Sequence, residues 1–302
     1  MSFNIGVDVG GTFIKCAVVD EKLNILSSGK TPTPEGALLP ETVVMIMREV
    51  CEKAGFDFCD ISSVGIGTTG VCDASRGVVI SCANIKGYEN IAICDYIEKH
   101  TNIKAYLDND ANCAALGEYA ALGEKCGNFL FITLGTGIGG GIILNGKLLR
   151  GINGAAGEIG HMTYVPNGEK CGCGKRGCWE KYASVSALVG QTKEAGFCGE
   201  VDGKTAFDEA ENGNQKAIYV IENWLGNVAD GICSLVNILQ PETVVIGGGV
   251  SREGEKILSP IREYVEKNSI TRGSGLPVPM LRASKLFNDA GVIGASLLYT
   301  QN

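Results

Sequence analysis

The chain has 302 residues, enough for one large domain or two ordinary ones, and 45% of them are apolar, enough to build buried cores. Its 26 basic and 34 acidic residues give a net charge of −8, which argues against a nucleic-acid-binding protein because phosphate backbones select basic surfaces. The first residues carry no basic segment followed by a long apolar run, and no stretch approaches roughly 18 uninterrupted apolar residues, so we expect neither a signal peptide nor a membrane span.

The first elements in the chain form a predicted β-hairpin around a glycine turn. Phe3–Val9 and Phe13–Val19 are apolar and β-branched, and two glycines with Thr12 separate them. Asp8 closes the first strand, so it could hold Mg²⁺ directly or through water, while the turn's amides, Thr12 and Lys15 face phosphates. An ordinary hairpin with a glycine turn is the alternative. The segment is neither a Walker A loop nor a Rossmann loop, because a strand follows it.

Further elements alternate between helix and strand. Apolar periodicity and good helix formers predict helices over Glu41–Lys53, Asn90–His100, Ala111–Leu122 and Ala217–Ile238, and short β-runs fall at Val64–Gly67, Lys104–Leu107 and Thr243–Ile246. This alternation indicates an α/β protein. Because no Pro/Ser-rich linker is present, two domains would meet at a hinge.

A polar turn follows the β-run that ends at Leu107, in the sequence Asp-Asn-Asp-Ala. Either Asn109 or Asp110 could simply cap the helix that begins here. The alternative is catalytic: Asp110 would be a general base that accepts a hydroxyl proton, and Asn109 would hydrogen-bond a neighbouring hydroxyl. Phosphoryl transfer from ATP needs one such oriented carboxylate.

A second strand, glycine turn and strand follow in the middle of the chain. Phe129–Leu134 and Ile142–Leu144 flank residues 135–141, where five of seven residues are glycine. A hairpin rarely needs so many glycines, and the repeat of the first arrangement indicates a duplicated domain. Two such loops could hold the phosphates of a nucleotide. A third β-run ends in three glycines at 247–249.

Three cysteines, Cys171, Cys173 and Cys178, lie within eight residues, and His161 precedes them by ten. Cys₃His is a closed tetrahedral donor set for zinc, so the metal would be structural; three reduced cysteines in a turn are the alternative. Thirteen cysteines in a chain without an expected export signal favour thiols and metal ligands over disulfides, and we expect a cytoplasmic protein. Glu158 and Glu180 flank this cluster and suit sugar hydroxyls, unless they are ordinary surface glutamates.

The motifs DVGGTFIK, LDNDANCAALGE, LGTGIGGG, GEIGHM and CGCGKRGCWE occur in one order along the chain. In that order they resemble the ROK family of repressors, open reading frames and sugar kinases, within the hexokinase–actin superfamily. The resemblance covers nearly the whole chain. It implies a two-lobed actin-like ATPase fold of the ribonuclease-H-like type, with a cleft between the lobes. We expect a small lobe of residues 1–116 plus 287–302, to which a helix over Asn288–Leu298 returns, and a large lobe of residues 117–286.

The resemblance also implies a role for each matching residue. The catalytic base is Asp110. The sugar-binding set comprises Asn84, Asn109, Asp110, Glu158, His161 and Glu180. The nucleotide-binding set comprises Asp8, Gly10, Gly11, Thr12, Lys15, Gly135, Thr136, Gly137, Gly248 and Gly249. The zinc ligands are His161, Cys171, Cys173 and Cys178, and the cofactors are ATP, Mg²⁺ and structural Zn²⁺.

The implied activity is transfer of phosphate from MgATP to the 6-hydroxyl of an aldohexose. Glucose is favoured, as in the glucokinase branch that feeds glycolysis, and a homodimer is the family expectation. An N-acetylmannosamine, N-acetylglucosamine or allose kinase uses much of the same framework. The Thr68-Thr69-Gly70 segment departs from glucose-type members, which often have a proline before this glycine. A sugar-responsive repressor would need a helix-turn-helix ahead of Asp8, and an acetate-kinase-like or chaperone ATPase would not explain the cysteine cluster.

Overall fold

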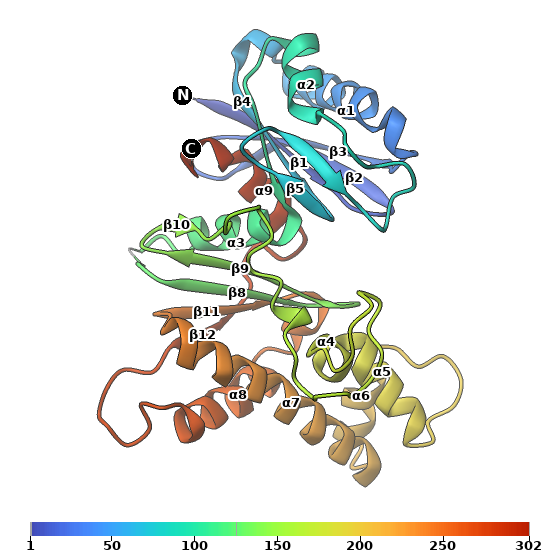
Figure 1. Ribbon diagram of the computed structural model, residues 1–302, viewed down its shortest axis with the longest axis vertical. Coiled ribbons are helices and arrows are strands. Elements are labelled where there is room, and N and C mark those ends of the chain that lie inside the picture. Colours follow the sequence, from blue (N-terminus) through green and yellow to red (C-terminus); the bar gives the residue numbers. More distant parts are fainter. Residues whose placement is uncertain (1, 125, 302) are drawn as a thin grey trace. The chain divides into compact units, whose positions relative to one another are not determined.

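A computed structural model describes residues 2–124 and 126–301 and divides the chain into two compact units (Figure 1). Unit 1 comprises Met1–Lys125, Gly141–Gly157 and Asn288–Asn302, and unit 2 comprises Cys126–Gly140 and Glu158–Phe287. This division differs from the expected lobes at residues 117–124 and 141–157, which belong to unit 1, and at Phe287, which belongs to unit 2. Residues 117–121 stay with unit 1 because one helix runs through Asp110–Ala121. The lobe boundaries at 116 and 286 remain a prediction, since compactness does not measure which parts move together.

Unit 1 is built on a five-stranded sheet in the order β3-β2-β1-β4-β7. The strands are β1 (Phe3–Val9), β2 (Phe13–Val19), β3 (Ile25–Pro32), β4 (Ile61–Thr68) and β7 (Ala105–Asn109). The first three run antiparallel, whereas β4 and β7 run parallel to β1. The parallel pairs place the carboxyl ends of β1, β4 and β7 at one edge, where polar side chains gather.

Helices flank this sheet. They are α1 (Leu39–Ala54), α2 (Ile93–Thr101), α3 (Asp110–Ala121) and α9 (Ala290–Ser296), with short helices η1 (Gly36–Leu38), η2 (Phe58–Asp60) and η6 (Leu298–Gln301). A small hairpin of β5 (Val71–Asp73) and β6 (Val78–Ser81) completes unit 1. The apolar side of α1 is buried against the sheet through Val43, Met47 and Val50.

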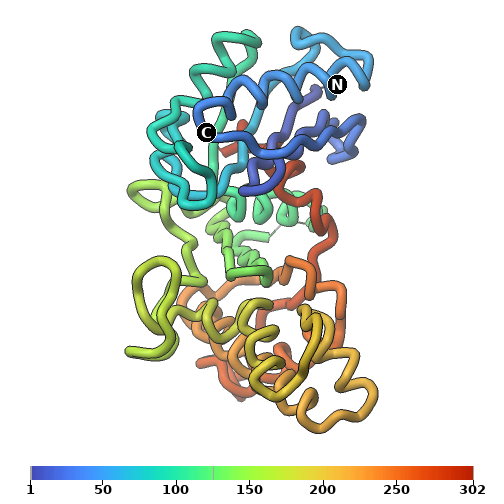
Figure 2. Tube along the Cα trace, turned by 90° about the vertical axis from the view of Figure 1, so that its right-hand side faces the viewer, coloured from blue at the N-terminus to red at the C-terminus, as the bar shows by residue number. Residues whose placement is uncertain are grey.

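The C-terminal helix α9 lies directly against the N-terminal strands, as the red and blue segments of Figure 2 show. Its backbone approaches so closely that a Cβ atom on Gly6 would lie 1.8 Å from Val292 O. A Cβ on Gly65 would lie 1.7 Å from Ala295 O. Only glycine fits at such distances, so these two positions dock the returning helix on β1 and β4. Helix α9 spans Ala290–Ser296 and is shorter than the expected Asn288–Leu298, because short 3₁₀ turns lie on either side of it at Phe287–Asp289 and Leu298–Gln301.

Unit 2 contains the strands β8 (Phe129–Leu134), β11 (Thr243–Gly247) and β12 (Met280–Ala283), all parallel. Their sheet has the order β10-β9-β8-β11-β12, and β9 (Ile138–Leu144) passes into unit 1 at Gly141 before β10 (Lys147–Leu148). The helices are α4 (Glu180–Ala183), α5 (Val185–Glu194), α6 (Thr205–Glu211), α7 (Gln215–Leu239) and α8 (Glu255–Asn268), with η3 (Ile159–His161), η4 (Gly249–Glu253) and η5 (Phe287–Asp289). The long helix α7 packs against α4, α5, α6 and α8.

The alternating strands and helices confirm the α/β prediction, but the second glycine loop is shorter than expected. Strand β9 already begins at Ile138, so three of the five glycines lie in a strand. A Cβ on Gly141 would meet Ala115 Cβ at 2.3 Å and Ala111 O at 2.9 Å. That glycine therefore allows β9 to lie close to α3. Over residues 2–124 and 126–301, no helix is both long and apolar enough to cross a membrane.

Candidate active site

The first glycine turn joins β1 to β2 as predicted. Gly10 N donates to Phe13 O at 3.0 Å, and the Thr33 hydroxyl donates to Gly10 O at 2.7 Å, which holds the turn from outside. Thr12 is exposed at its tip. A Cβ on Gly11 would lie 3.4 Å from Asn84 Cβ, so the structure brings exposed Asn84 next to this turn.

Asp8 lies at the end of β1, opposite Lys15 of β2. Burial raises the pKa of the Asp8 carboxyl, and the Lys15 charge acts in the opposite direction. Lys15 Nζ donates to Asn288 O at 2.9 Å, and Gly291 of α9 lies against the Asp8 carboxylate, where a Cβ would be 3.1 Å from Oδ2. The half-buried Asp8 carboxylate is an oxygen ligand of the kind that a hard cation such as Mg²⁺ prefers, and the N–H groups of the neighbouring turn suit phosphate oxygens.

The polar turn between β7 and α3 has Asn109 as its helix cap and Asp110 as the first residue of the helix. Asn109 is the helix cap, since its Oδ1 accepts from Ala111 N at 2.8 Å and from Asn112 N at 3.3 Å. Its Nδ2 donates to Gly70 O at 3.4 Å, within the segment where the sequence departs from glucose-type members. Asp110 is half-buried in the first turn of α3, and its Oδ1 shares the Ala111 N–H. Capping therefore fixes the turn that carries Asp110.

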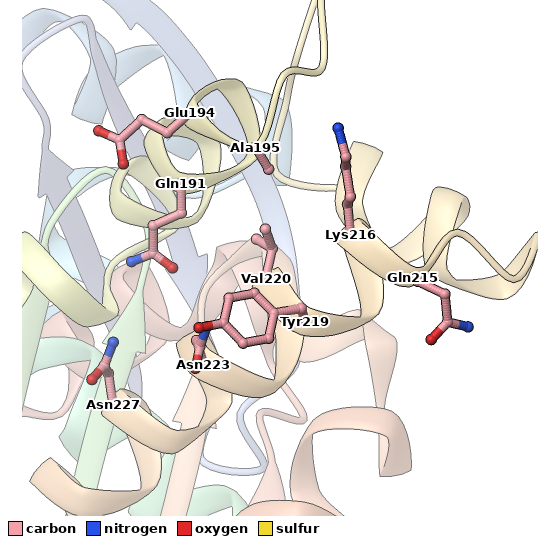
Figure 3. Close-up of a pocket in the computed structure, with 9 residues that line it drawn as sticks. All are labelled: Gln191, Glu194, Ala195, Gln215, Lys216, Tyr219, Val220, Asn223 and Asn227. Atoms are coloured by element: carbon pink, nitrogen blue, oxygen red, sulfur yellow. The ribbon is translucent and has the colours of Figure 1, made fainter.

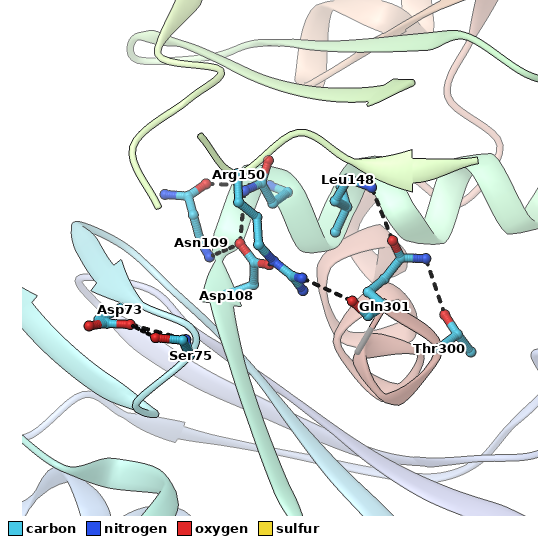
Figure 4. A network of polar contacts seen from close by, with 9 residues as sticks. Asp73, Ser75, Asp108, Asn109, Leu148, Arg150, Thr300 and Gln301 are labelled. Atoms are coloured by element: carbon cyan, nitrogen blue, oxygen red, sulfur yellow. Dashed lines mark hydrogen bonds and ion pairs between the residues drawn. The ribbon is translucent and has the colours of Figure 1, made fainter. Parts of the chain in front are cut away.

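The sequence analysis did not identify Asp108 and Arg150, which stabilise this turn through contacts on its buried side. Asp108 is buried and forms an ion pair with Arg150, with Nε to Oδ2 at 2.6 Å (Figure 4). The signal available in the sequence was a third polar residue, Asp108, directly after the buried β-run. Its partner could not be identified, since Arg150 follows 42 residues later.

The second glycine turn, in unit 2, is held by backbone contacts. Gly135 N donates to Gly137 O at 3.0 Å, and Val185 N at the start of α5 donates to Gly135 O at 2.9 Å. Gly248 follows β11 with φ of 87°, and a Cβ there would lie 2.0 Å from Leu134 O. The two glycine segments of unit 2 are thus in contact. One residue of each segment is exposed, Thr136 in the first and Gly249 in the second.

The four predicted metal ligands come together in unit 2. The donor atoms of His161, Cys171, Cys173 and Cys178 all lie within 4.8 Å of one another. Cys171 Sγ is 3.7 Å from His161 Nδ1, and Cys173 Sγ is 3.6 Å from Cys178 Sγ. Tetrahedral zinc with bonds of about 2.3 Å to sulfur would place ligand sulfurs about 3.8 Å apart. The donor set therefore fits one tetrahedral metal ion through Nδ1 of the histidine.

Glu180 lies beside this donor set at the start of α4. Its Oε1 accepts from Cys171 Sγ at 3.0 Å and is 3.6 Å from His161 Nδ1. Burial, together with this hydrogen bond, raises the pKa of Cys171 to about 12, whereas a backbone hydrogen bond from Lys175 lowers the pKa of Cys173. A Cβ on Gly137 would lie 2.6 Å from Glu180 Oε2. Glu180 thus contacts both the cysteine cluster and the second glycine turn.

Trp179 anchors the segment between Cys178 and Glu180. Its indole is fully buried, and Nε1 donates to Asn227 O in α7 at 2.8 Å. Tyr164 reinforces the attachment through a hydrogen bond from its hydroxyl to Asn227 Oδ1 at 3.1 Å. The cysteine loop is therefore attached to α7 by two hydrogen bonds to Asn227. Glu158, in contrast, is exposed, and its main-chain oxygen accepts from His161 N at 3.1 Å.

A groove of about 650 Å³ runs between α5 and α7 in unit 2 (Figure 3). Polar and amphipathic side chains line it: Gln191, Glu194, Gln215, Lys216, Tyr219, Asn223 and Asn227, with Ala195 and Val220. None of these is a predicted site residue. Asn227 and Gln191 both donate to Tyr182 O, at 3.5 and 3.1 Å, so the groove borders the helix that carries Glu180.

Each unit therefore brings together some of the residues that the sequence predicted for the site. Unit 1 brings together Asp8, the first glycine turn and Asn84 on one loop cluster, and it holds Asp110 on a capped turn. Unit 2 brings together the metal-ligating set, Glu180 and the second glycine turn. Turn amides bind phosphate, a fixed carboxylate accepts a proton, and carboxylates accept hydrogen bonds from hydroxyls.

Three comparisons place the chain among known proteins. The ROK family matches residues 4–302. A glucokinase of Streptomyces coelicolor is 38% identical over 316 residues, covering 98% of this chain and 97% of that protein. An N-acetylmannosamine kinase of Yersinia pseudotuberculosis is 35% identical over 302 residues and 98% of both chains. The solved structure of a ROK family glucokinase from Streptomyces griseus in complex with glucose and AMPPNP has a TM-score of 0.83 and 35% identity over all of both chains, which confirms the predicted actin-like fold.

Proposed function

The chain belongs to the ROK family, and from this we propose that it is an ATP-dependent hexose kinase with glucose as its preferred substrate. The observation that carries the proposal is its 38% identity with a glucokinase over 98% of the chain. The capped turn that presents Asp110 supports the same chemistry. The product would be glucose 6-phosphate, with ADP released.

Asp110 is the general base in this proposal. It would accept the proton of the sugar 6-hydroxyl while the oxygen forms a bond to the γ-phosphorus of ATP and the bond to the ADP oxygen breaks. The Asn109 cap and the Ala111 N–H fix the turn that carries this carboxylate. A base held in this way needs little reorganisation before proton transfer.

The nucleotide would be bound by glycine turns from both units. The turn of Gly10, Gly11 and Thr12 with Lys15 would contact phosphates through backbone N–H groups, a hydroxyl and an ammonium. Gly135, Thr136 and Gly137 would form the second phosphate loop, and Gly248 and Gly249 would approach the adenosine. Asp8 would hold Mg²⁺, directly or through water; bound there, the cation would neutralise phosphate charge.

The sugar would contact polar residues of both units: Asn84, Asn109 and Asp110 from unit 1, and Glu158, His161 and Glu180 from unit 2. Carboxylate and amide oxygens accept hydrogen bonds from sugar hydroxyls. Glu180 supports this role because its side chain is partly buried and lies directly against Gly137 of the second glycine turn.

Zinc is the metal we propose for the Cys₃His set. Three thiolates and one imidazole are its preferred donors in closed structural sites. With Nδ1 facing the cysteines, Nε2 of His161 would remain for a sugar hydroxyl. The metal would thus fix the orientation of the imidazole.

An N-acetylhexosamine kinase is the second candidate, favoured by the 35% identity with an N-acetylmannosamine kinase. The residues that would decide between these substrates include Thr69. Its hydroxyl is 3.1 Å from Cys82 Sγ, and the next residue, Gly70, accepts the hydrogen bond from Asn109. A change in this segment would therefore act on Asn109, a proposed sugar contact, through its hydrogen bond to Gly70.

We further propose that the protein is cytoplasmic and forms a homodimer. Its two lobes would be residues 1–116 with 287–302, and residues 117–286.

The test is a comparison of sugar-dependent ADP release for glucose, mannose, allose, N-acetylglucosamine and N-acetylmannosamine. Glucose should give the highest kcat/KM. A higher value for an N-acetylated sugar would overturn the substrate while retaining the mechanism, and no release with any sugar would overturn the kinase.

A further inference from the structure

Asp108 is a buried carboxylate that the proposed chemistry does not use. Its side chain is 2% exposed. Oδ1 accepts from the main-chain N of Asn109 and from Asn112 Nδ2, both at 2.8 Å, and Oδ2 accepts from Arg150 Nε at 2.6 Å. An ionised carboxylate is strongly disfavoured in such a position unless it is paired, so Arg150 is what allows a charged Asp108 here.

Arg150 joins this carboxylate to two other segments of unit 1 (Figure 4). Its Nη1 donates to Gln301 O at 3.1 Å, and Gln301 Oε1 in turn accepts from Leu148 N at 3.0 Å. The main-chain O of Arg150 accepts from Ala156 N at 3.1 Å. The guanidinium therefore connects the turn after β7, the segment after β10 and the C-terminal turn.

The contacts of Asp108 reach both sides of Asp110. They hold the peptide N–H of Asn109, one residue before, and the amide of Asn112, two residues after. The same two residues take part in the cap of α3, in which Asn109 Oδ1 accepts a hydrogen bond from the main-chain N of Asn112. A rotation of the Asp108 side chain would therefore change the turn from which the Asp110 carboxylate extends.

We propose that Arg150 is a positioning residue for phosphoryl transfer, acting through Asp108 on the direction of Asp110. This inference rests on the proposed function, in which Asp110 is the general base. A displacement of about 1 Å of a reacting group can lower the rate about 100-fold, so a residue remote from the substrate can determine kcat.

The alternative is an ion pair that only stabilises unit 1. Buried pairs are weak evidence for stability, and removal of one partner destabilises because it leaves an unpaired charge. The two roles differ in what changes. A stabilising pair alters the fraction of folded protein, whereas a positioning residue alters kcat of the folded enzyme through Asp110.

The test begins with the full-length variants Arg150→Met and Arg150→Lys, with kcat measured on folded protein. Arg150→Met should lower kcat about 30- to 100-fold and change KM for ATP by less than about threefold. Arg150→Lys retains the positive charge but lacks the planar guanidinium that donates through both Nε and Nη1, so its kcat should lie between those of Arg150→Met and the wild type. Arg76→Met removes an exposed arginine paired with Asp73 in the same unit and should leave kcat unchanged. If Arg150→Met does not fold, Arg150→Met with Asp108→Asn removes the unpaired charge and should show the same loss.

Combination with Asp110→Asn decides between the two roles. In that background Arg150→Met should lower the residual rate by less than about threefold, because the group that it positions is already lost. An equal fold-loss in both backgrounds would overturn the proposal, as would normal kcat in folded Arg150→Met. If Asp110→Asn retains full activity, the assignment of the base fails instead.

Amide hydrogen exchange tests the effect of Arg150 on this turn without measuring catalysis. This test therefore remains valid even if the chain phosphorylates no sugar. Arg150→Met should speed exchange at the Asn109, Ala111 and Asn112 amides at least about tenfold, while amides of β8 in unit 2 stay unchanged. Unchanged exchange at this turn would overturn the positioning role.

Discussion

Two glycines inside helix α7 should respond to alanine in opposite directions. Gly226 has no atom within 4 Å of an added Cβ. Gly231 is buried, and its Cβ would lie 2.1 Å from Trp179 Cε2 and 2.3 Å from Nε1. Glycine in a helix interior is destabilising by about 0.5–1 kcal/mol relative to alanine, so Gly226→Ala should stabilise the protein by that amount.

Gly231→Ala should instead destabilise it. The fully buried indole of Trp179 cannot move into solvent, so the clash belongs at the upper end of the range for overpacked cores, about 3 kcal/mol. The helix gain offsets about 1 kcal/mol of this, which leaves a net loss of about 2 kcal/mol. The two variants should then differ by about 3 kcal/mol.

Urea unfolding followed by tryptophan fluorescence measures this difference directly. The chain has two tryptophans, Trp179 and Trp224, and both belong to unit 2, so the signal reports the unit that contains α7. Equal stability of the two alanine variants would refute the packing argument. Because Trp179 separates Cys178 from Glu180, Gly231→Ala should also raise KM for the sugar, while Gly226→Ala should not.

Three further predictions concern the base, the metal and a surface-facing carboxylate. Asp110→Asn should lower kcat by about 10²–10⁴ with sugar affinity nearly unchanged by calorimetry; near-normal turnover would remove Asp110 as the base. The purified protein should contain about one zinc per chain by elemental analysis. Cys173→Ser should lose it and raise KM for the sugar, whereas exposed Cys198→Ser should retain it, and a fully active metal-free protein would contradict the zinc assignment. Burial raises the pKa of Glu98, but hydrogen bonds from Lys104 and from a main-chain amide lower it by more than burial raises it. The pKa of Glu98 is therefore depressed overall. Its stabilisation is therefore present at neutral pH and lost in acid. Glu98→Gln should lower Tm at pH 7, and the difference should shrink as the pH falls from about 4 through the lower folded-state pKa, whereas a constant difference would oppose this reasoning.

Local patterns in the sequence were sufficient to predict much of the fold. The alternation of apolar residues with glycine turns predicted β1, β2 and β8 with the ends that the structure has. The cysteine spacing with His161 predicted a donor set whose atoms do lie together. These features depend on neighbours close in the chain, where residue type alone constrains geometry.

Contacts between distant segments could not be predicted in the same way. In the sequence, Gly6 and Gly65 are indistinguishable from other glycines in predicted strands. Their role depends on α9, which lies against them in the structure although it follows more than two hundred residues later. Arg150 had no visible partner in the sequence, although it neutralises the buried Asp108. Local patterns predict the glycines of β9 as loop, because the close approach of Gly141 to α3 depends on a tertiary contact.

The most direct test of the central claim is a coupled assay of ADP release with MgATP across the hexose panel, with the phosphorylated position identified by NMR. A hexose kinase of the kind proposed should release ADP only when sugar is present, prefer glucose by kcat/KM and yield glucose 6-phosphate. Sugar-independent ATP hydrolysis, or no turnover with any hexose by the folded, zinc-loaded protein, would contradict it.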